Sequence, residues 1–173
     1  AIPSSSDLKK LPEDKLQEEI NKHINSAIQL ISQSNFKSIE KERLIKIINE
    51  YIKLEKNREY FQVIKTESES KVDVNGLQFS TRIDRMDQMK DGTNLIIDYK
   101  TGQNVNLSQL TGDPLDQAQL PIYAITNPVA GIAFATVNSK DCQFKAITKN
   151  KFDLPLSQQA IKRMPEWNKQ VSE

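Results

Sequence analysis

The sequence predicts a mixed α/β fold, in which helices come first, three antiparallel strands follow, and a helix and a further strand complete the core. Three observations predict it. Apolar residues recur at three- and four-residue steps early in the chain. Alternating strand patterns in the middle surround two tight-turn signals, Asn75-Gly76 and Asp91-Gly92. The apolar run from Val129 to Val137 is typical of a strand buried on both faces.

The composition fits one globular domain without a strong charge. The chain has 173 residues, 37% of them hydrophobic, and a net charge of +1, so bulk electrostatics gives no argument for nucleic-acid binding. A single cysteine, Cys142, excludes an internal disulfide or a multi-cysteine metal site and is typical of a cytoplasmic protein. No run is long and apolar enough for a membrane span, so we expect no membrane partner.

The N-terminal part is predicted to be helical. We expect residues 1–12 to be a flexible lead-in and residues 13–173 to be one domain, an excerpt of a longer chain. Helical periodicity runs from Glu13 to about Ser32 and from Ser38 to Asn57. The only histidine, His23, has no second histidine or cysteine nearby, and we interpret it as a solvated helix residue rather than a ligand.

The middle of the chain predicts a meander of strands. Tyr60–Glu69 forms a first strand and Lys71–Val74 a second, followed by the Asn75-Gly76 hairpin signal. Leu77–Asp87 alternates, and its apolar side should pack on a helix. The chain then returns antiparallel over Asn94–Lys100.

Three charged side chains should converge in this last hairpin. Asp84 falls on the polar side of its strand, and Asp98 and Lys100, two residues apart at the end of a buried strand, share a face. If the register brings Asp84 near Asp98, the carboxylates repel unless a cation lies between them. Oxygen ligands without sulfur or imidazole favour Mg²⁺ or Mn²⁺ over zinc.

A second group of polar residues follows a polar loop. Asp113-Pro114 is a helix-start signal, and Gln119 and Tyr123, four residues apart, should share one face of that helix. Pro121 lies between them and is expected to kink or interrupt the helix.

The C-terminal part is predicted to be a strand and a helix. Cys142–Ile147 should pair beside the Val129–Val137 strand, and Ser157–Val171 should form a closing C-terminal helix.

Three motifs in this order resemble the nuclease domain of RecB-type exonucleases, members of the PD-(D/E)xK, or restriction-endonuclease-like, superfamily. The motifs are Thr81-Arg82-Ile83-Asp84-Arg85-Met86-Asp87, Ile96-Ile97-Asp98-Tyr99-Lys100-Thr101-Gly102 and Gln119-Leu120-Pro121-Ile122-Tyr123-Ala124. The resemblance covers Glu40 to Val137, includes Arg58-Glu59-Tyr60-Phe61, and is closest to the bacterial "probable DNA repair protein" branch, akin to the second subunit of AddAB-type helicase–nucleases. It implies a restriction-endonuclease-like core and a metal-dependent DNA exonuclease in DNA repair, with DNA and a helicase subunit as partners.

The resemblance also implies roles by position. Asp84 and Asp98 would bind Mg²⁺ or Mn²⁺, aided by the backbone carbonyl of Tyr99. Lys100 would position or activate the attacking water and offset charge in the transition state. Gln119 and Tyr123 would lie beside the cleft and orient Lys100, a metal-bound water or the DNA backbone.

Several positions depart from the family pattern. Thr81 replaces the usual glycine, His23 does not lie in the Gly-x-x-x-His setting of relatives, and Cys142 alone cannot hold the iron–sulfur cluster that many relatives carry. Glu67 is a further acid, but we do not expect it to be a primary ligand. We therefore expect the excerpt itself to cleave DNA slowly or undetectably, and faster when the upstream helix is restored.

Two alternatives compete with a nuclease. One is a degenerate nuclease fold that acts as a DNA-binding or scaffolding module, although such folds typically lose the acids or the lysine, which this chain retains at Asp84, Asp98 and Lys100. The other is an unrelated α/β protein in which Asp98 and Lys100 form a structural ion pair. Divalent-metal-dependent release of nucleotides from DNA, with an Asp98→Ala control, separates a nuclease from both alternatives.

Overall fold

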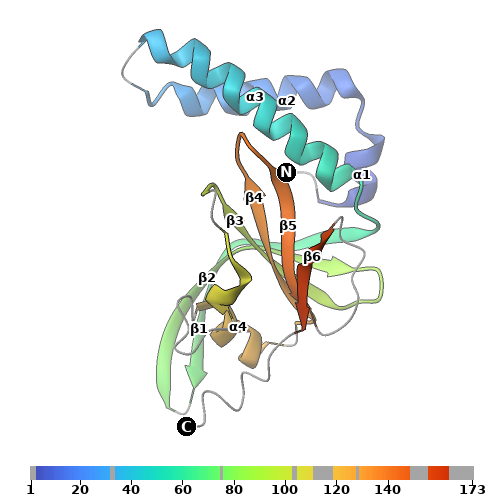
Figure 1. The fold of residues 1–173 in the computed structure, drawn as a ribbon, viewed down its shortest axis with the longest axis vertical. Coiled ribbons are helices and arrows are strands. Elements are labelled where there is room, and N and C mark those ends of the chain that lie inside the picture. The colour runs from blue at the N-terminus through green and yellow to red at the C-terminus, as the bar shows by residue number, and fades with distance from the viewer. Residues whose placement is uncertain are drawn as a thin grey trace.

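A six-stranded sheet organises the chain in the computed structural model, with strand order β1-β2-β3-β4-β5-β6 (Figure 1). The structure describes residues 3–31, 34–74, 76–102, 105–110, 119–127, 129–148 and 156–163. Its helices are α1 (Ser5–Lys10), α2 (Glu13–Ile28), α3 (Ser34–Lys56), the 3₁₀ helix η1 (Leu107–Leu110) and α4 (Gln119–Thr126). Its strands are β1 (Phe61–Val74), β2 (Leu77–Met89), β3 (Asn94–Lys100), β4 (Gly131–Val137), β5 (Cys142–Thr148) and β6 (Leu156–Arg163).

The pairing of the strands gives the predicted core. β1, β2 and β3 form a consecutive antiparallel meander. β4 then pairs parallel with β3, and the connection between these two strands contains α4. Parallel neighbours need such a crossover. The predicted α/β core of helix, three antiparallel strands, helix and strand is confirmed, as is the pairing of β5 beside β4.

The central part of the sheet is buried on both faces, each under a different helix. α4 contributes Leu120 and Tyr123 to a cluster with Met86 and Ile96 on one face. Tyr51 and Leu54 of α3 pack against a second cluster on the other face, which includes Leu95, Ile97 and Phe144. Because side chains alternate along a strand, Asp98 and Lys100 share the α4 face with Ile96. Asp98 and Lys100 therefore lie on the α4 face, at the end of β3 and beyond the residues that pack against α4.

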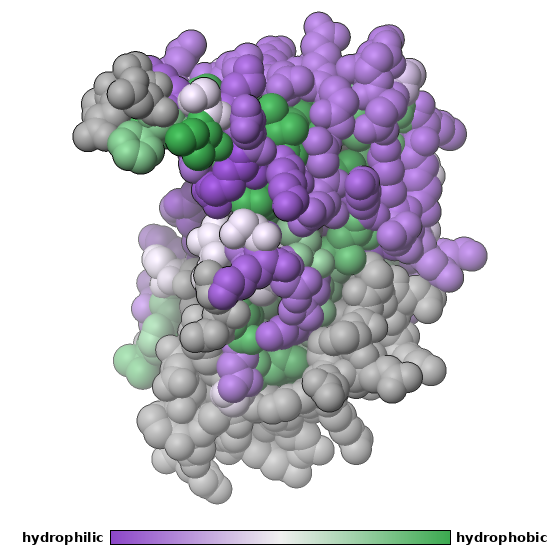
Figure 2. All heavy atoms as spheres, turned by 45° about the horizontal axis from the view of Figure 1, so that its top comes forward, coloured by the Kyte–Doolittle hydropathy of each residue, from purple (hydrophilic) through white to green (hydrophobic). Residues whose placement is uncertain are grey.

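The helices α2 and α3 form an antiparallel hairpin next to the sheet (Figure 1). Leu16, Ile20 and Ile24 of α2 are buried against apolar residues of α3 such as Leu44 and Ile48. Hydrophilic side chains predominate over these helices on the face that Figure 2 shows. The amphipathic helices are confirmed, although α2 ends before Ser32 and α3 begins before Ser38. No helix among the described residues is long and apolar enough to span a membrane.

Residues 3–12 of the expected flexible lead-in are structured instead. Ser4 caps α1 by accepting a hydrogen bond from the Asp7 N–H at 3.1 Å, and Leu8 is buried. The Val63 N–H donates to the Pro3 carbonyl at 2.7 Å, and Ser5 Oγ accepts from the Phe61 N–H at 3.2 Å. This segment satisfies donors of the edge strand β1, a tertiary contact that local composition does not reveal.

Three local expectations are also corrected. β1 is one continuous strand rather than two, because β2 pairs with it along its length. The apolar side of β2 is only partly covered, since Leu77 and Phe79 are exposed. Pro121 does not interrupt α4, because it lies in the first turn, where a missing amide donor removes no intrahelical bond.

The predicted C-terminal helix is wrong over residues 156–163. This segment is β6, which pairs parallel with β5, with Phe144 opposite Leu156 and Ala146 opposite Ile161. The free edge of β5 offers backbone partners that can override helical periodicity. Residues 164–173 and the expected helix start at Asp113-Pro114 lie outside the described residues.

Candidate functional site

The candidate site forms where β2 and β3 separate. The ladder between these strands runs from Gln88 opposite Asn94 to Arg85 opposite Ile97, and the next residues are Asp84 and Asp98. The backbone N–H of Tyr99 donates to Asp84 Oδ2 at 2.9 Å. The carboxylate of Asp84 is therefore tied to the end of β3, beside Asp98.

Lys100 completes this charged group. Its Nζ lies 2.8 Å from Asp98 Oδ2 and 5.3 Å from the centre of the Phe134 ring. The Asp98 and Lys100 side chains are only 18% and 28% exposed. Asp98 Oδ2 is buried, and Lys100 Nζ is the charged donor that faces it; this oxygen has no other hydrogen-bond donor among the described residues. A divalent cation that binds this oxygen would have to share it with the Lys100 ammonium or displace that group.

The pKa of Asp98 also indicates a carboxylate that its surroundings do not fully stabilise in the charged form. Burial raises the pKa of its carboxyl and the charge of Asp84 raises it further, while Lys100 opposes both effects. One lysine thus does not fully compensate two neighbouring carboxylates. No group of three His, Cys, Asp or Glu side chains within the described residues could hold a metal ion. The two carboxylates fit a hard divalent cation that takes its other ligands from water or substrate.

The raised pKa of Asp98 has a consequence for stability. Because the folded protein holds this proton more tightly than the unfolded chain does, Asp98 destabilises the metal-free protein above its folded pKa, and this cost disappears as pH falls toward about 4. We expect Asp98→Asn to stabilise the metal-free protein at about pH 7 and much less at about pH 4. Urea unfolding in a chelator measures both. An equal effect at the two pH values would contradict this prediction.

Of the second polar motif, the structure describes the Tyr123 side chain but not that of Gln119. Tyr123 is 1% exposed, within the core cluster under α4, and its hydroxyl accepts a hydrogen bond from Lys65 Nζ at 3.5 Å. The backbone of Gln119 opens α4, but its side chain lies outside the described residues. Whether the two residues act on Lys100 stays a prediction.

Lys65 was not among the residues selected from the sequence. Simple alternation puts it on the side of Phe61 and Val63. The register of β1 against β2 shifts between Val63 and Lys65, however, so Lys65 pairs with Met86, on the face of the candidate site. A bulge of this kind moves a side chain to the other face, and no sequence signal marked it.

Glu67 lies near Asp84 along the β1–β2 ladder, but its carboxylate pairs with an arginine. Its carboxylate forms an exposed ion pair with Arg82, and its backbone adopts a positive φ of 46°. Glu67 therefore adds no third carboxylate to Asp84 and Asp98 in the described arrangement.

The other face of the same strands holds a buried charge network of Glu55, Arg58, Arg85 and Asp87. Arg58 lies 2.7 Å from Asp87 and 2.8 Å from Glu55, and Arg85 lies 2.6 Å from Asp87 and 3.0 Å from Glu55. Burial would lower the pKa of Arg85, but Glu55 and Asp87 outweigh it and raise that pKa overall. Arg85 also donates to the Tyr99 hydroxyl at 3.1 Å.

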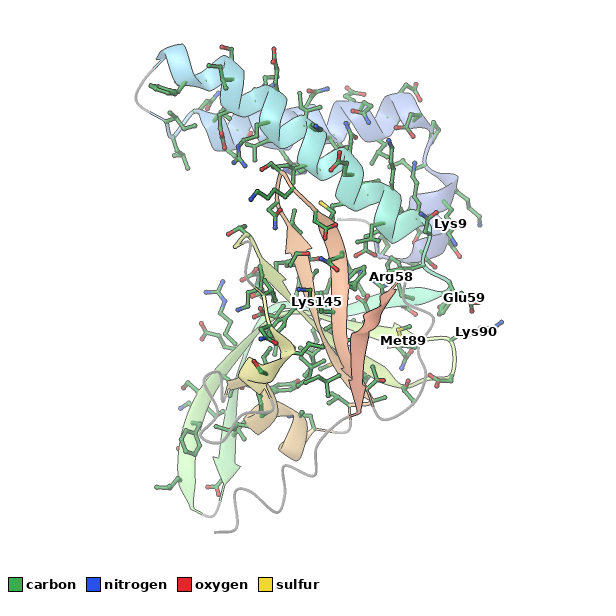
Figure 3. The ribbon with its side chains drawn as sticks, viewed as in Figure 1. Lys9, Arg58, Glu59, Met89, Lys90 and Lys145 are labelled. Carbon is green, nitrogen blue, oxygen red and sulfur yellow. The ribbon has the colours of Figure 1, made fainter. Side chains whose placement is uncertain are left out.

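This network gives a structural role to several motif residues. Arg58 follows α3 and reaches β2, so the network joins that helix to the strand carrying Asp84 (Figure 3). Lys145 of β5, which pairs with Phe134 of β4, donates to the Val105 carbonyl at 2.7 Å and holds the segment after β3 against the sheet.

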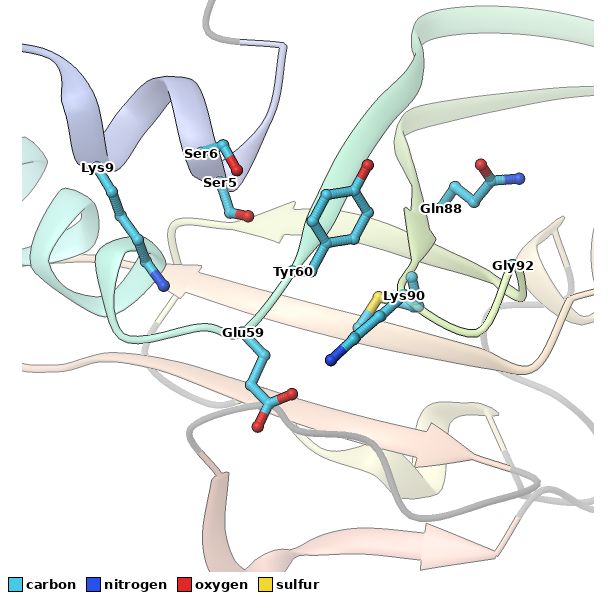
Figure 4. Close-up of a pocket in the computed structure, with 9 residues that line it drawn as sticks. Ser5, Ser6, Lys9, Glu59, Tyr60, Gln88, Lys90 and Gly92 are labelled. Carbon is cyan, nitrogen blue, oxygen red and sulfur yellow. The ribbon is translucent and has the colours of Figure 1, made fainter.

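A cavity of about 860 Å³ lies elsewhere, at the other end of β2 (Figure 4). Ser5, Ser6, Lys9, Glu59, Tyr60, Gln88, Met89, Lys90 and Gly92 line it. It contains none of the three charged residues at the end of β3. We assign the candidate site to Asp84, Asp98 and Lys100 because of their chemistry, and not to this cavity because of its size.

Comparison with protein families identifies the class of protein that this fold and site define. The model of the PD-(D/E)XK nuclease superfamily matches residues 3–128, and the chain belongs to that superfamily. The solved structure described as "Crystal structure of SSO0001" is similar with a TM-score of 0.36 and 17% identity, over 86% of this chain and 68% of that chain. The comparison with curated proteins gives no match.

Proposed function

We propose that the protein is a divalent-metal-dependent deoxyribonuclease of the RecB-type branch, acting as an exonuclease in DNA repair or recombination together with a helicase subunit. Membership of the nuclease superfamily supports nuclease activity. The observation that carries the proposal is the grouping of the buried Asp98 carboxylate with Asp84 and Lys100. The branch, the repair role and the helicase partner rest on the sequence motifs.

In this proposal Asp84, Asp98 and the Tyr99 carbonyl hold Mg²⁺ or Mn²⁺. The bound ion would supply Lewis-acid polarisation of the phosphate and a coordinated water. Asp84 is kept in position by the Tyr99 N–H. Lys100 is more exposed than Asp98, so its Nζ can reach the substrate. There it would donate a hydrogen bond to the attacking water and offset the negative charge that develops on the phosphate oxygens.

The test is cleavage of end-labelled single-stranded and duplex DNA with Mg²⁺ or Mn²⁺ titrated, beside Mn²⁺ binding measured without DNA. We expect metal binding that is weak, because only two carboxylates contribute, and cleavage that requires the metal. Cleavage that persists in a chelator would contradict the proposal. DNA binding with no cleavage at any metal concentration would favour the scaffolding alternative.

A further inference from the structure

Lys65 lies on the same sheet face as the candidate site, one strand beyond Asp84. The shift at Val63 and Lys65 sets it opposite Met86, and Met86 lies opposite Ile96, two residues before Asp98. Two strand spacings and one two-residue step separate Lys65 from Asp98, roughly 12 Å between Cα atoms. A lysine side chain covers a good part of that distance.

The amine of Lys65 has a hydrogen-bond partner but, within the described part of the chain, no carboxylate partner. The Tyr123 hydroxyl, fixed by packing at 1% exposure, accepts from Lys65 Nζ at 3.5 Å. None of the ion pairs that the described residues form includes Lys65. Its residue is exposed, on the edge strand of the sheet.

An exposed ammonium without a carboxylate partner, anchored on a buried hydroxyl, suits an anionic ligand. The arrangement of negative charges along a nucleic acid fits this position. Nucleic acid presents a phosphate at every nucleotide, so a strand with its reacting phosphate at Asp84 and Asp98 has further phosphates within reach of the same sheet face. Lysine binds such groups as a point charge.

We propose that Lys65, oriented by the Tyr123 hydroxyl, binds a backbone phosphate of the nucleic-acid strand beside the one that reacts. This inference rests on the proposed function and adds a contact on β1, the edge strand of the sheet. Lys65 takes no part in the chemistry. It fixes the position of the strand and contributes to affinity through counterion release.

The test is the salt dependence of binding to single-stranded DNA without a divalent metal, for Lys65→Gln and for the matched variant Lys71→Gln. Lys71 is also an exposed lysine of β1 but lies opposite Ser80, further along the hairpin. One lost phosphate contact should make the slope of log K against log salt shallower by about 0.7 for Lys65→Gln. Lys71→Gln should keep the wild-type slope.

Tyr123→Phe separates orientation from charge. It keeps the buried ring, so we expect the wild-type salt slope but weaker binding, because the lysine charge remains while its position is lost. An unchanged slope in Lys65→Gln, or the same change in both lysine variants, overturns the inference alone if the wild type still cleaves DNA. A wild type that neither binds nor cleaves DNA overturns the proposed function as well.

Discussion

An Asp98→Asn variant is expected to lose metal-dependent DNA cleavage while remaining folded. The substitution keeps the volume of the side chain but removes the charge of the partly buried carboxylate that lies beside Asp84 and Lys100. Loss of groups that only orient a metal ligand already costs about 10–100-fold, so loss of a ligand itself should cost at least about a hundredfold. Single-turnover cleavage and Mn²⁺ titration measure the two effects, which should fall together.

The matched control is Asp14→Asn, which removes an exposed carboxylate from α2, remote from the sheet. It should leave both cleavage and Mn²⁺ affinity at wild-type values. Cleavage by Asp98→Asn within a few-fold of the wild type would show that this carboxylate does not hold the metal, and would exclude the proposed site.

An Asp87→Asn variant is expected to show the largest loss of stability. Asp87 is 0% exposed and lies between Arg58 and Arg85, so its neutralisation leaves two buried guanidinium groups with one carboxylate, Glu55. Breaking a buried ion pair costs about 3–5 kcal/mol, a large share of the roughly 5–15 kcal/mol of a whole domain. Urea unfolding followed by circular dichroism measures the free energy of unfolding.

Arg43→Gln is the comparison for that variant, because it removes a pair with Glu40 on the surface of α3. Exposed pairs contribute about 0–1 kcal/mol, so this variant should unfold almost as the wild type does. Losses of similar size in the two variants would show that the buried network contributes no more than a surface pair.

The candidate site could be predicted largely from the sequence because it depends on short-range geometry. The spacing of Asp98 and Lys100 on one strand fixes their common face. The Asp91-Gly92 signal predicted the turn between β2 and β3, where Gly92 has a φ of 81°, and the tight turn sets Asp84 near Asp98. Strand alternation and turn chemistry are local rules, and here the structure follows them.

The sequence itself therefore determined the order of the core elements and the convergence of Asp84, Asp98 and Lys100. Only the tertiary structure decided that Lys65 lies on the site face, that 156–163 is a strand, and which charges are buried together on the other face. A bulge changes which face a residue occupies, and a free sheet edge or an opposing ion is a partner distant in sequence. Such long-range partners leave no periodicity in the chain, and their energies override local preference.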